Sequence, residues 1–98
     1  MKRPIEPNFA RALRAVRRAR GLAQEEFDQI SSRTYISSLE RGLKQPTLSK
    51  VVSLAEVLDV HPLTLLTLSF CDNLSQKEAG RVLERVSAEV AELAAIDR

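Results

Sequence analysis

Residues that end and begin helices divide this chain into short segments, and this division limits its possible folds more than any other feature. Gly21 and Gly42 can each adopt the left-handed backbone conformation that closes a helix. Pro46 precedes another segment, and Pro62 lies in the first turn of a further one, where proline is well tolerated. Within the segments, apolar residues recur every three or four positions, as on one face of a helix. The sequence therefore predicts an all-α fold of five or six helices and no convincing strand.

Three helices are expected in the first half of the chain. Pro7 and Asn8 open the first, which Gly21 closes, and the second runs from about 23 to 30. The third is framed by Ser32, which can cap its N-terminus, and by Gly42. The apolar residues of this third helix share one face and are expected to be buried: Ile36, Leu39 and Leu43.

Three more helices are expected in the second half. Thr47 caps the fourth, Pro62 opens the fifth, and Ser75 with Glu78 resembles a capping box that opens a sixth, which ends near Ala95. The fourth helix has an expected buried stripe of Leu48, Val51, Val52, Ala55 and Leu58. The sixth carries apolar residues at helical spacing: Ala79, Val82, Val86, Val90, Leu93 and Ile96.

The composition indicates one folded domain. A chain of 98 residues can bury one modest core, and 44% hydrophobic with 29% charged residues is ordinary for a soluble globular protein. Aromatic residues make up only 4%, which argues against single-stranded bases stacking on an aromatic platform. The longest apolar stretch, residues 62–71, is too short for a membrane span, and no apolar run follows the basic start "MKRP". The lone cysteine fits a reducing cytoplasm.

Charge is distributed unevenly between the two halves. Residues 1–50 contain 11 Lys and Arg side chains against 5 acidic ones, whereas residues 51–98 contain 4 against 8. This asymmetry suggests that the first half faces a polyanion while the second half does something else.

The outer face of the third predicted helix has an unusual composition. Thr34, Ser37, Ser38 and Arg41 form it, with Arg33 beside them. Serine and threonine are only moderate helix formers, so helix propensity does not explain a solvent face that is built from them. Short donors and acceptors flanked by arginines suit a face that meets another polar surface closely.

Two stretches of the sequence resemble a known family. These are "RRARGLAQEEF" and "SSRTYISSLERGLKQPTLSKVVSLAEVLDVHPLTLL". Together they resemble the phage-repressor and Cro-like (XRE-type) helix-turn-helix domain over roughly residues 9–70. We therefore expect residues 1–72 to form a helix-turn-helix DNA-binding domain and residues 73–98 to form a C-terminal helix. The resemblance implies that the third helix docks in the major groove of double-stranded DNA, whose width of about 12 Å admits a helix.

The resemblance also implies roles for individual residues. Those expected to contact base edges are Arg33, Thr34, Ser37 and Ser38. Those expected to contact phosphates are Gln24, Tyr35, Arg41 and Lys44. Arg33 is the strongest candidate for a bidentate contact to guanine. Arg17 and Glu40 match a pair that the family keeps as an internal salt bridge, so we assign them to structure.

The chain departs from the family pattern between "GLAQEE" and "YIS". This segment is two residues shorter than usual, Asp28 replaces a small residue, and the turn glycine is missing. The turn must therefore be rebuilt, with Ile30 packing inward and Ser31 or Ser32 capping the next helix.

Several side chains have simpler interpretations than a functional one. Arg11, Arg14 and Arg18 can form a solvated face. His61 is expected to be a helix cap rather than a metal ligand, and Cys71 a small apolar filler. The paired acids Glu25 and Glu26 compensate the helix dipole better than they suit acid–base catalysis.

These observations favour a sequence-specific transcriptional regulator that binds double-stranded DNA. The regulator would be a homodimer on a pseudo-palindrome with half-sites about 34 Å apart, without enzymatic activity, metal, cofactor or evident small-molecule ligand. The residues expected to form the dimer contact are Leu65, Leu66, Phe70, Val82, Val86, Val90 and Leu93. Two alternatives remain open: an antitoxin-like adapter that holds a partner protein through the last helix, and a nonspecific nucleoid-type binder.

Overall fold

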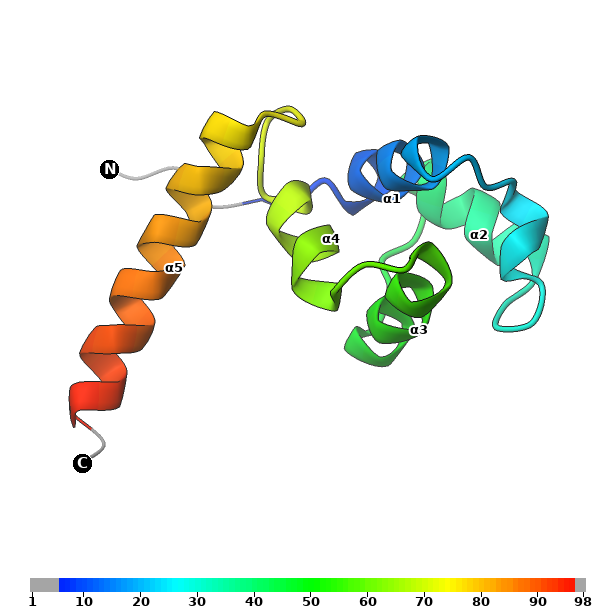
Figure 1. The fold of residues 1–98 in the computed structure, drawn as a ribbon. Helices are drawn as coiled ribbons and strands as arrows, with labels where there is room; N and C mark the ends of the chain where they lie inside the picture. The colour runs from blue at the N-terminus through cyan, green and yellow to red at the C-terminus, as the bar shows by residue number, and fades with distance from the viewer. Residues whose placement is uncertain (1–5, 97–98) are drawn as a thin grey trace.

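Five α-helices and one 3₁₀ turn make up the regular structure of residues 6–96 (Figure 1). They are seen in a computed structural model that describes residues 6–96. In chain order they are α1 (Phe9–Ala19), η1 (Gln24–Phe27), α2 (Arg33–Glu40), α3 (Leu48–Leu58), α4 (Pro62–Ser69) and α5 (Gln76–Ile96). Residues 6–96 contain no strand. The predicted all-α fold, with a last helix added to a compact group of shorter ones, is confirmed.

The helix N-termini are capped by the side chains that the sequence suggested. The side chains of Asn8, Ser32 and Thr47 each accept a hydrogen bond of 3.1 Å from the backbone N–H three residues further on. His61 accepts at Nδ1 from the backbone N–H of Leu63 at 3.0 Å, so it is a cap of α4 as predicted. Each cap satisfies an N–H group that has no partner within the helix.

The expected glycines end α1 and α2. Gly21 has a φ of +69° and Gly42 a φ of +74°, both in the left-handed region that glycine adopts without steric cost. Asp59 takes the same conformation after α3, with a φ of 56°. The chain thus changes direction after each of α1, α2 and α3.

The core lies between α1, α2, α3 and α4. Its fully buried large side chains come from every one of these helices and from η1: Leu13, Phe27, Ile36, Leu39, Leu54, Leu58 and Leu65. No residue of α5 is buried. The first four helices and η1 therefore form a domain that is packed without help from α5.

The second predicted helix is a single 3₁₀ turn rather than an α-helix. Only residues 24–27 are helical, and the backbone N–H groups of Ile30 and Ser31 both donate to the carbonyl of Phe27 at 3.0 Å. Few residues are available for a longer helix here, because η1 ends at Phe27 and Ser32 already caps α2. Phe27 is fully buried and Ile30 packs against the core, as the shortened segment required.

Three apolar residues that were predicted to be buried are exposed. Leu43 is 62% exposed, Leu48 73% and Val52 46%. Leu43 follows Gly42, whose left-handed backbone ends the α2 face before that residue is reached. The side of α3 that meets the core is narrower than predicted and consists of Val51, Leu54, Ala55 and Leu58.

The last helix, α5, extends away from the domain. In Figure 1 it stands beside α4 and diverges from it toward the C-terminus. The predicted capping box is half formed: Ser75 Oγ accepts from the backbone N–H of Glu78 at 3.3 Å, but Glu78 Oε1 accepts from the backbone N–H of Asp72 at 2.6 Å. Glu78 thus fixes the turn before the helix.

Across residues 6–96, length and apolar content together give no single helix that could cross a membrane, although the bent pair of α3 and α4 meets both criteria jointly.

Candidate nucleic-acid interface

The orientation of α2 is fixed by an ion pair between α1 and the end of α2. Arg17 Nε lies 2.5 Å from Glu40 Oε2, and Arg17 Nη2 donates to Glu40 Oε1 at 2.8 Å. The pair is largely enclosed, since the side chains are 12% and 4% exposed. Arg17 and Glu40 thus form the internal ion pair that the resemblance implied.

The pKa of the Glu40 carboxyl reflects this enclosure. Burial raises the pKa, but hydrogen bonds from Arg17 and Gln24 and the charges of Arg17 and Arg14 outweigh it, so the pKa lies below its ordinary value. The hydrogen bonds that Arg17 donates to Glu40 raise the pKa of Arg17 in turn. Both groups are therefore charged at neutral pH, and the bidentate contact holds α2 against α1.

Gln24, which was predicted to contact a phosphate, lies at the start of η1 and turns toward the same carboxylate. Its Nε2 donates to Glu40 Oε1 at 3.1 Å. One of the two amide N–H groups is thus used inside the protein, and the other is the donor that could reach a phosphate.

Two more arginines of α1, together with Arg20 directly after it, bind the ends of other helices. Arg14 donates to the carbonyl of Glu40 at 2.7 Å, at the C-terminus of α2. Arg20 donates to the carbonyls of Leu58 and Asp59, both at 3.0 Å, at the C-terminus of α3. Arg11 donates to two carbonyl oxygens just beyond α4. Helix C-termini carry unsatisfied carbonyls and partial negative charge, so each contact is favourable.

These contacts correct the view of α1 as a basic outer surface. The alternative that these arginines form a solvated face fails for Arg11 and Arg14, which are half-buried and hydrogen-bonded, whereas Arg18 is exposed. Much of the positive charge in the first half of the chain therefore serves internal structure. The charge that remains available is concentrated around α2.

The polar face of α2 is accessible as expected. Arg33 and Thr34 are exposed in its first turn, Ser37 and Ser38 are half-buried in the middle, and Arg41 is exposed at its C-terminus. Thr34, Ser37, Ser38 and Arg41 lie opposite the buried Ile36 and Leu39, and Arg33 lies beside them at the start of the helix. The structure thus brings the predicted base-contacting set together on one side of one helix.

Two carboxylates lie close to the most exposed of these arginines. Arg33 Nη2 is 3.6 Å from Asp28 Oδ2 and 3.8 Å from Glu25 Oε2, and all three side chains are about half exposed or more. Solvent-exposed pairs of this kind contribute little to stability. Arg33 therefore remains free to exchange these partners for a ligand.

A basic cluster lies at the edge of the polar face of α2. The ammonium groups of Lys44 and Lys50 lie 5.7 Å and 5.6 Å from the ring centroid of Tyr35. Lys50 also donates to the carbonyl of Ile30 at 2.7 Å. Lys50 was absent from the predicted site. The sequence does hold a signal for Lys50: it lies in the first turn of α3, where the helix dipole disfavours a cation, so a role outside the helix is indicated.

The residues predicted to form a dimer contact divide into three groups by exposure. Leu65 is fully buried in the core of its own domain, so it is a core residue and cannot form a contact between chains. Leu66 and Val82 are half-buried, while Phe70, Val86, Val90 and Leu93 are exposed. The sequence did not distinguish the buried side of α4 from its exposed side, because α4 is apolar on nearly all sides.

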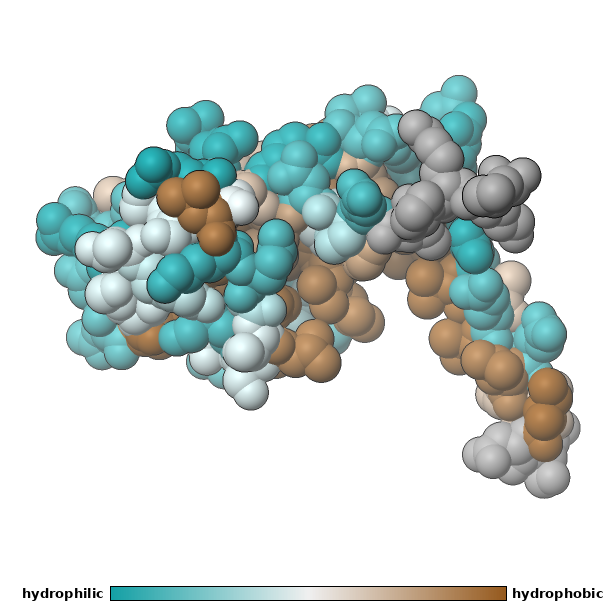
Figure 2. All heavy atoms as spheres, turned by 180° about the vertical axis from the view of Figure 1, so that it is seen from behind, coloured by the Kyte–Doolittle hydropathy of each residue, from teal (hydrophilic) through white to brown (hydrophobic). Residues whose placement is uncertain are grey.

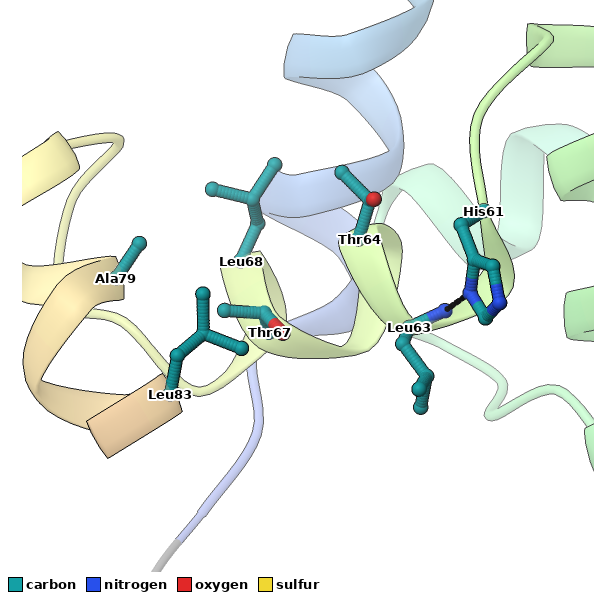
Figure 3. Close-up of a pocket in the computed structure, with 7 residues that line it drawn as sticks. All are labelled: His61, Leu63, Thr64, Thr67, Leu68, Ala79 and Leu83. Atoms are coloured by element: carbon teal, nitrogen blue, oxygen red, sulfur yellow. Dashed lines mark hydrogen bonds between the residues drawn. The ribbon is translucent and has the colours of Figure 1, made fainter. Parts of the chain in front are cut away.

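An open apolar groove separates α4 from the first turns of α5. It has a volume of about 370 Å³ and is lined by His61, Leu63, Thr64, Thr67, Leu68, Ala79 and Leu83 (Figure 3). Figure 3 shows Ala79 and Leu83 of α5 on one wall and the side chains of α4 on the other. We call it the α4–α5 groove.

Comparison with known proteins agrees with this geometry. The model of a family described as Helix-turn-helix matches residues 13–65. A relative described as an uncharacterized HTH-type transcriptional regulator, y4dJ of Sinorhizobium fredii, is 42% identical over 69 residues, which are 68% of this chain and 84% of that protein. No solved structure matches the chain significantly. The chain belongs to the XRE-type helix-turn-helix family of DNA-binding transcriptional regulators, a family that is generally non-enzymatic.

Proposed function

We propose that this protein regulates transcription by binding double-stranded DNA sequence-specifically as a homodimer, with α2 in the major groove of each half-site. The observation that carries the proposal is the composition of the accessible side of α2, where short hydroxyls and arginines lie opposite a buried apolar face. Such side chains can approach base edges closely and both donate and accept hydrogen bonds.

The roles of individual residues follow from their positions on α2. Arg33 is at the N-terminal end, where it can give two parallel hydrogen bonds to guanine. Thr34, Ser37 and Ser38 line the same side and can read bases or a thymine methyl. Phosphate contacts from the surrounding donors fix the register: Gln24, Tyr35, Arg41, Lys44 and Lys50.

A dimer would present two copies of α2 to the two halves of an inverted repeat. The exposed apolar residues of α5, together with the α4–α5 groove, support a contact between copies in this part of the chain. Occupancy of a promoter would then block or recruit polymerase.

Selection of bound duplexes from a randomised library at near-physiological salt tests this function. We expect enrichment of an inverted repeat with half-sites about one helical turn, roughly 34 Å, apart. A pool without enrichment, with uniform affinity and a steep salt dependence, would instead establish a nonspecific binder.

Substitutions then assign the contacts. Arg33→Ala should weaken binding to the selected site by about 1–3 kcal/mol and relax the choice of base, whereas Lys44→Ala should weaken binding about equally on all sequences. Arg85→Ala is the matched control, because it removes the same charge from α5, at the far end of the molecule from α2 (Figure 1). Unchanged base preference in Arg33→Ala would show that the register of α2 differs from the one proposed.

An adapter that holds another protein is the second candidate, and the exposed apolar face of α5 is the observation in its favour. Val86→Asp separates the two functions. A dimeric regulator should lose cooperative DNA binding through monomerisation, while an adapter should keep its DNA affinity and lose its protein partner.

A further inference from the structure

Two carboxylates lie beside the arginine that the proposed function assigns to reading a base. Arg33 Nη2 is 3.6 Å from Asp28 Oδ2 and 3.8 Å from Glu25 Oε2. Both contacts use one nitrogen of a guanidinium that carries five N–H groups in a planar fork. Donors therefore remain on the other edge of the guanidinium for a further acceptor.

The rebuilt turn before α2 brings both carboxylates to the same place. The backbone N–H of Asp28 donates to the carbonyl of Glu25 at 3.0 Å, so the 3₁₀ geometry of η1 continues through Asp28. Residues three apart lie on the same side of a 3₁₀ turn, and Glu26 therefore lies on a different side. Arg33, the first residue of α2, is positioned against the side that Glu25 and Asp28 share.

The other basic side chains around α2 have no such partners. Arg41, Lys44 and Lys50, which are proposed to contact phosphates, have no carboxylate within 4.0 Å among residues 6–96. Hydropathy does not make this distinction, because Figure 2 shows mainly hydrophilic and intermediate side chains at the end of the molecule remote from α5, whereas hydrophobic atoms gather along one side of α5. Charge thus separates Arg33 from the basic side chains around it.

A phosphate and the edge of a guanine differ in charge, and the two carboxylates respond to that difference. A phosphate bound to Arg33 would bring negative charge close to Asp28 and Glu25. Guanine O6 and N7 are neutral acceptors, which the free edge of the guanidinium can reach while Nη2 stays beside the carboxylates. In water, two unit charges about 4 Å apart change an equilibrium constant roughly fivefold.

We propose that Asp28 and Glu25 are specificity-determining residues, which keep Arg33 from binding phosphates and so reserve it for a neutral base edge. The inference rests on the proposed function, in which Arg33 reads guanine. Nonspecific DNA offers phosphates in every register, and the two carboxylates lower the affinity for it by denying it one contact. Repulsion of the wrong partner thereby adds to the discrimination that the contact with guanine provides.

Neutralising both carboxylates tests this inference. Glu25→Gln with Asp28→Asn removes the two charges and retains the shape of the side chains. The full chain is titrated over a series of salt concentrations with the duplex selected from the randomised library and with a scrambled duplex of the same length. We expect the variant to bind the scrambled duplex roughly fivefold more tightly, and the ratio of the two affinities to fall by about the same factor. The log–log salt dependence on the scrambled duplex should steepen by about one, because Arg33 gains a phosphate contact.

Two further variants separate this effect from a general change in charge. Glu26→Gln with Glu56→Gln removes the same charge from two exposed side chains of the same domain that are not paired with Arg33, and it should leave the ratio of affinities unchanged. In an Arg33→Ala background, Glu25→Gln with Asp28→Asn should not change the ratio further, because the arginine that the carboxylates restrain is absent.

The other outcomes contradict the inference in different ways. Equal tightening on both duplexes would show that the carboxylates repel DNA generally. Weaker binding to the selected duplex alone would show that they orient Arg33 toward guanine without excluding phosphate. Either result would overturn this inference while the selected inverted repeat still supports the proposed function. A selection that enriches no sequence would overturn both together.

Discussion

Helices α1 and α5 are both amphipathic and rich in charge, yet they occupy opposite environments. In α1, four side chains are buried and Arg11, Arg14, Arg17 and Arg20 reach the ends of other helices. In α5, no side chain is buried, and the hydrogen bond between charged side chains is the exposed one from Arg85 to Glu89 at 3.3 Å. The contrast shows that an amphipathic pattern specifies a surface to be covered but not what covers it. For α1 the cover is the same chain; for α5 we propose a second copy.

The largest expected effect comes from breaking the ion pair of α1. Glu40→Gln leaves the Arg17 guanidinium enclosed without a counter-charge and should lower the free energy of unfolding by about 3–5 kcal/mol, measured by urea denaturation. Glu89→Gln in the exposed pair of α5 is the control and should cost less than about 0.5 kcal/mol at low protein concentration. Similar losses in both variants would remove the distinction between the two helices.

The same ion pair predicts a dependence of stability on pH. The pKa of Glu40 is lowered in the folded state, so its contribution is fully present above the unfolded-state pKa of about 4.3 and is lost as the pH falls through the folded-state value. The difference in unfolding free energy between the wild type and Glu40→Gln should therefore shrink below about pH 4. A difference that stays constant from pH 7 to pH 3 would contradict this account.

A charge on the exposed side of α5 should act on association and not on folding. Val86→Asp should weaken the dimer by about 2 kcal/mol, because a carboxylate would be placed in an apolar contact, and leave the circular dichroism of the chain unchanged. Sedimentation analysis measures the first effect. Ala88→Asp, on the opposite side of the same helix, should leave the dimer intact, and an equal effect of both variants would argue against a contact through the apolar side of α5.

The smallest expected effect is a difference in stability between substitutions of two arginines at the C-terminal end of α1, Arg18 and Arg20. Arg20→Ala removes two hydrogen bonds to the C-terminus of α3 and should cost about 1 kcal/mol of unfolding free energy. Arg18 lies two residues earlier and is exposed, so Arg18→Ala should cost almost no unfolding free energy. Thermal denaturation of the two variants under one condition makes the comparison, and a greater loss for Arg18→Ala would reverse it.

The sequence was sufficient for features that depend on near neighbours. The caps Asn8, Ser32 and Thr47 act on N–H groups three residues away, and Gly21 and Gly42 act on their own backbone, so pattern and spacing predicted them correctly. The position of the polar residues on α2 follows in the same way from helical periodicity.

Features that depend on distant segments were not predictable. The partners of Arg11 and Arg20 are backbone carbonyls about 40 to 60 residues away, which no local pattern encodes. Leu48 and Leu65 have the same side chain and both follow helical spacing, but the first is 73% exposed and the second is fully buried. Only the packing of α3 and α4 on their neighbours separates them. The 3₁₀ turn at residues 24–27 likewise results from closing a shortened connection.

The arginines of α1 also have a mechanical consequence. Because they connect one helix to the ends of α2, α3 and α4, these helices move as one rigid body, and α2 cannot tilt toward DNA independently. Adjustment of the proposed dimer to a longer or shorter operator is therefore expected in residues 70–75, between α4 and α5. That segment is held by the hydrogen bond from the backbone N–H of Asp72 to Glu78. Under the proposed function, the tolerance of the protein for operator spacing is thus set at a joint remote from every residue that is proposed to touch a base.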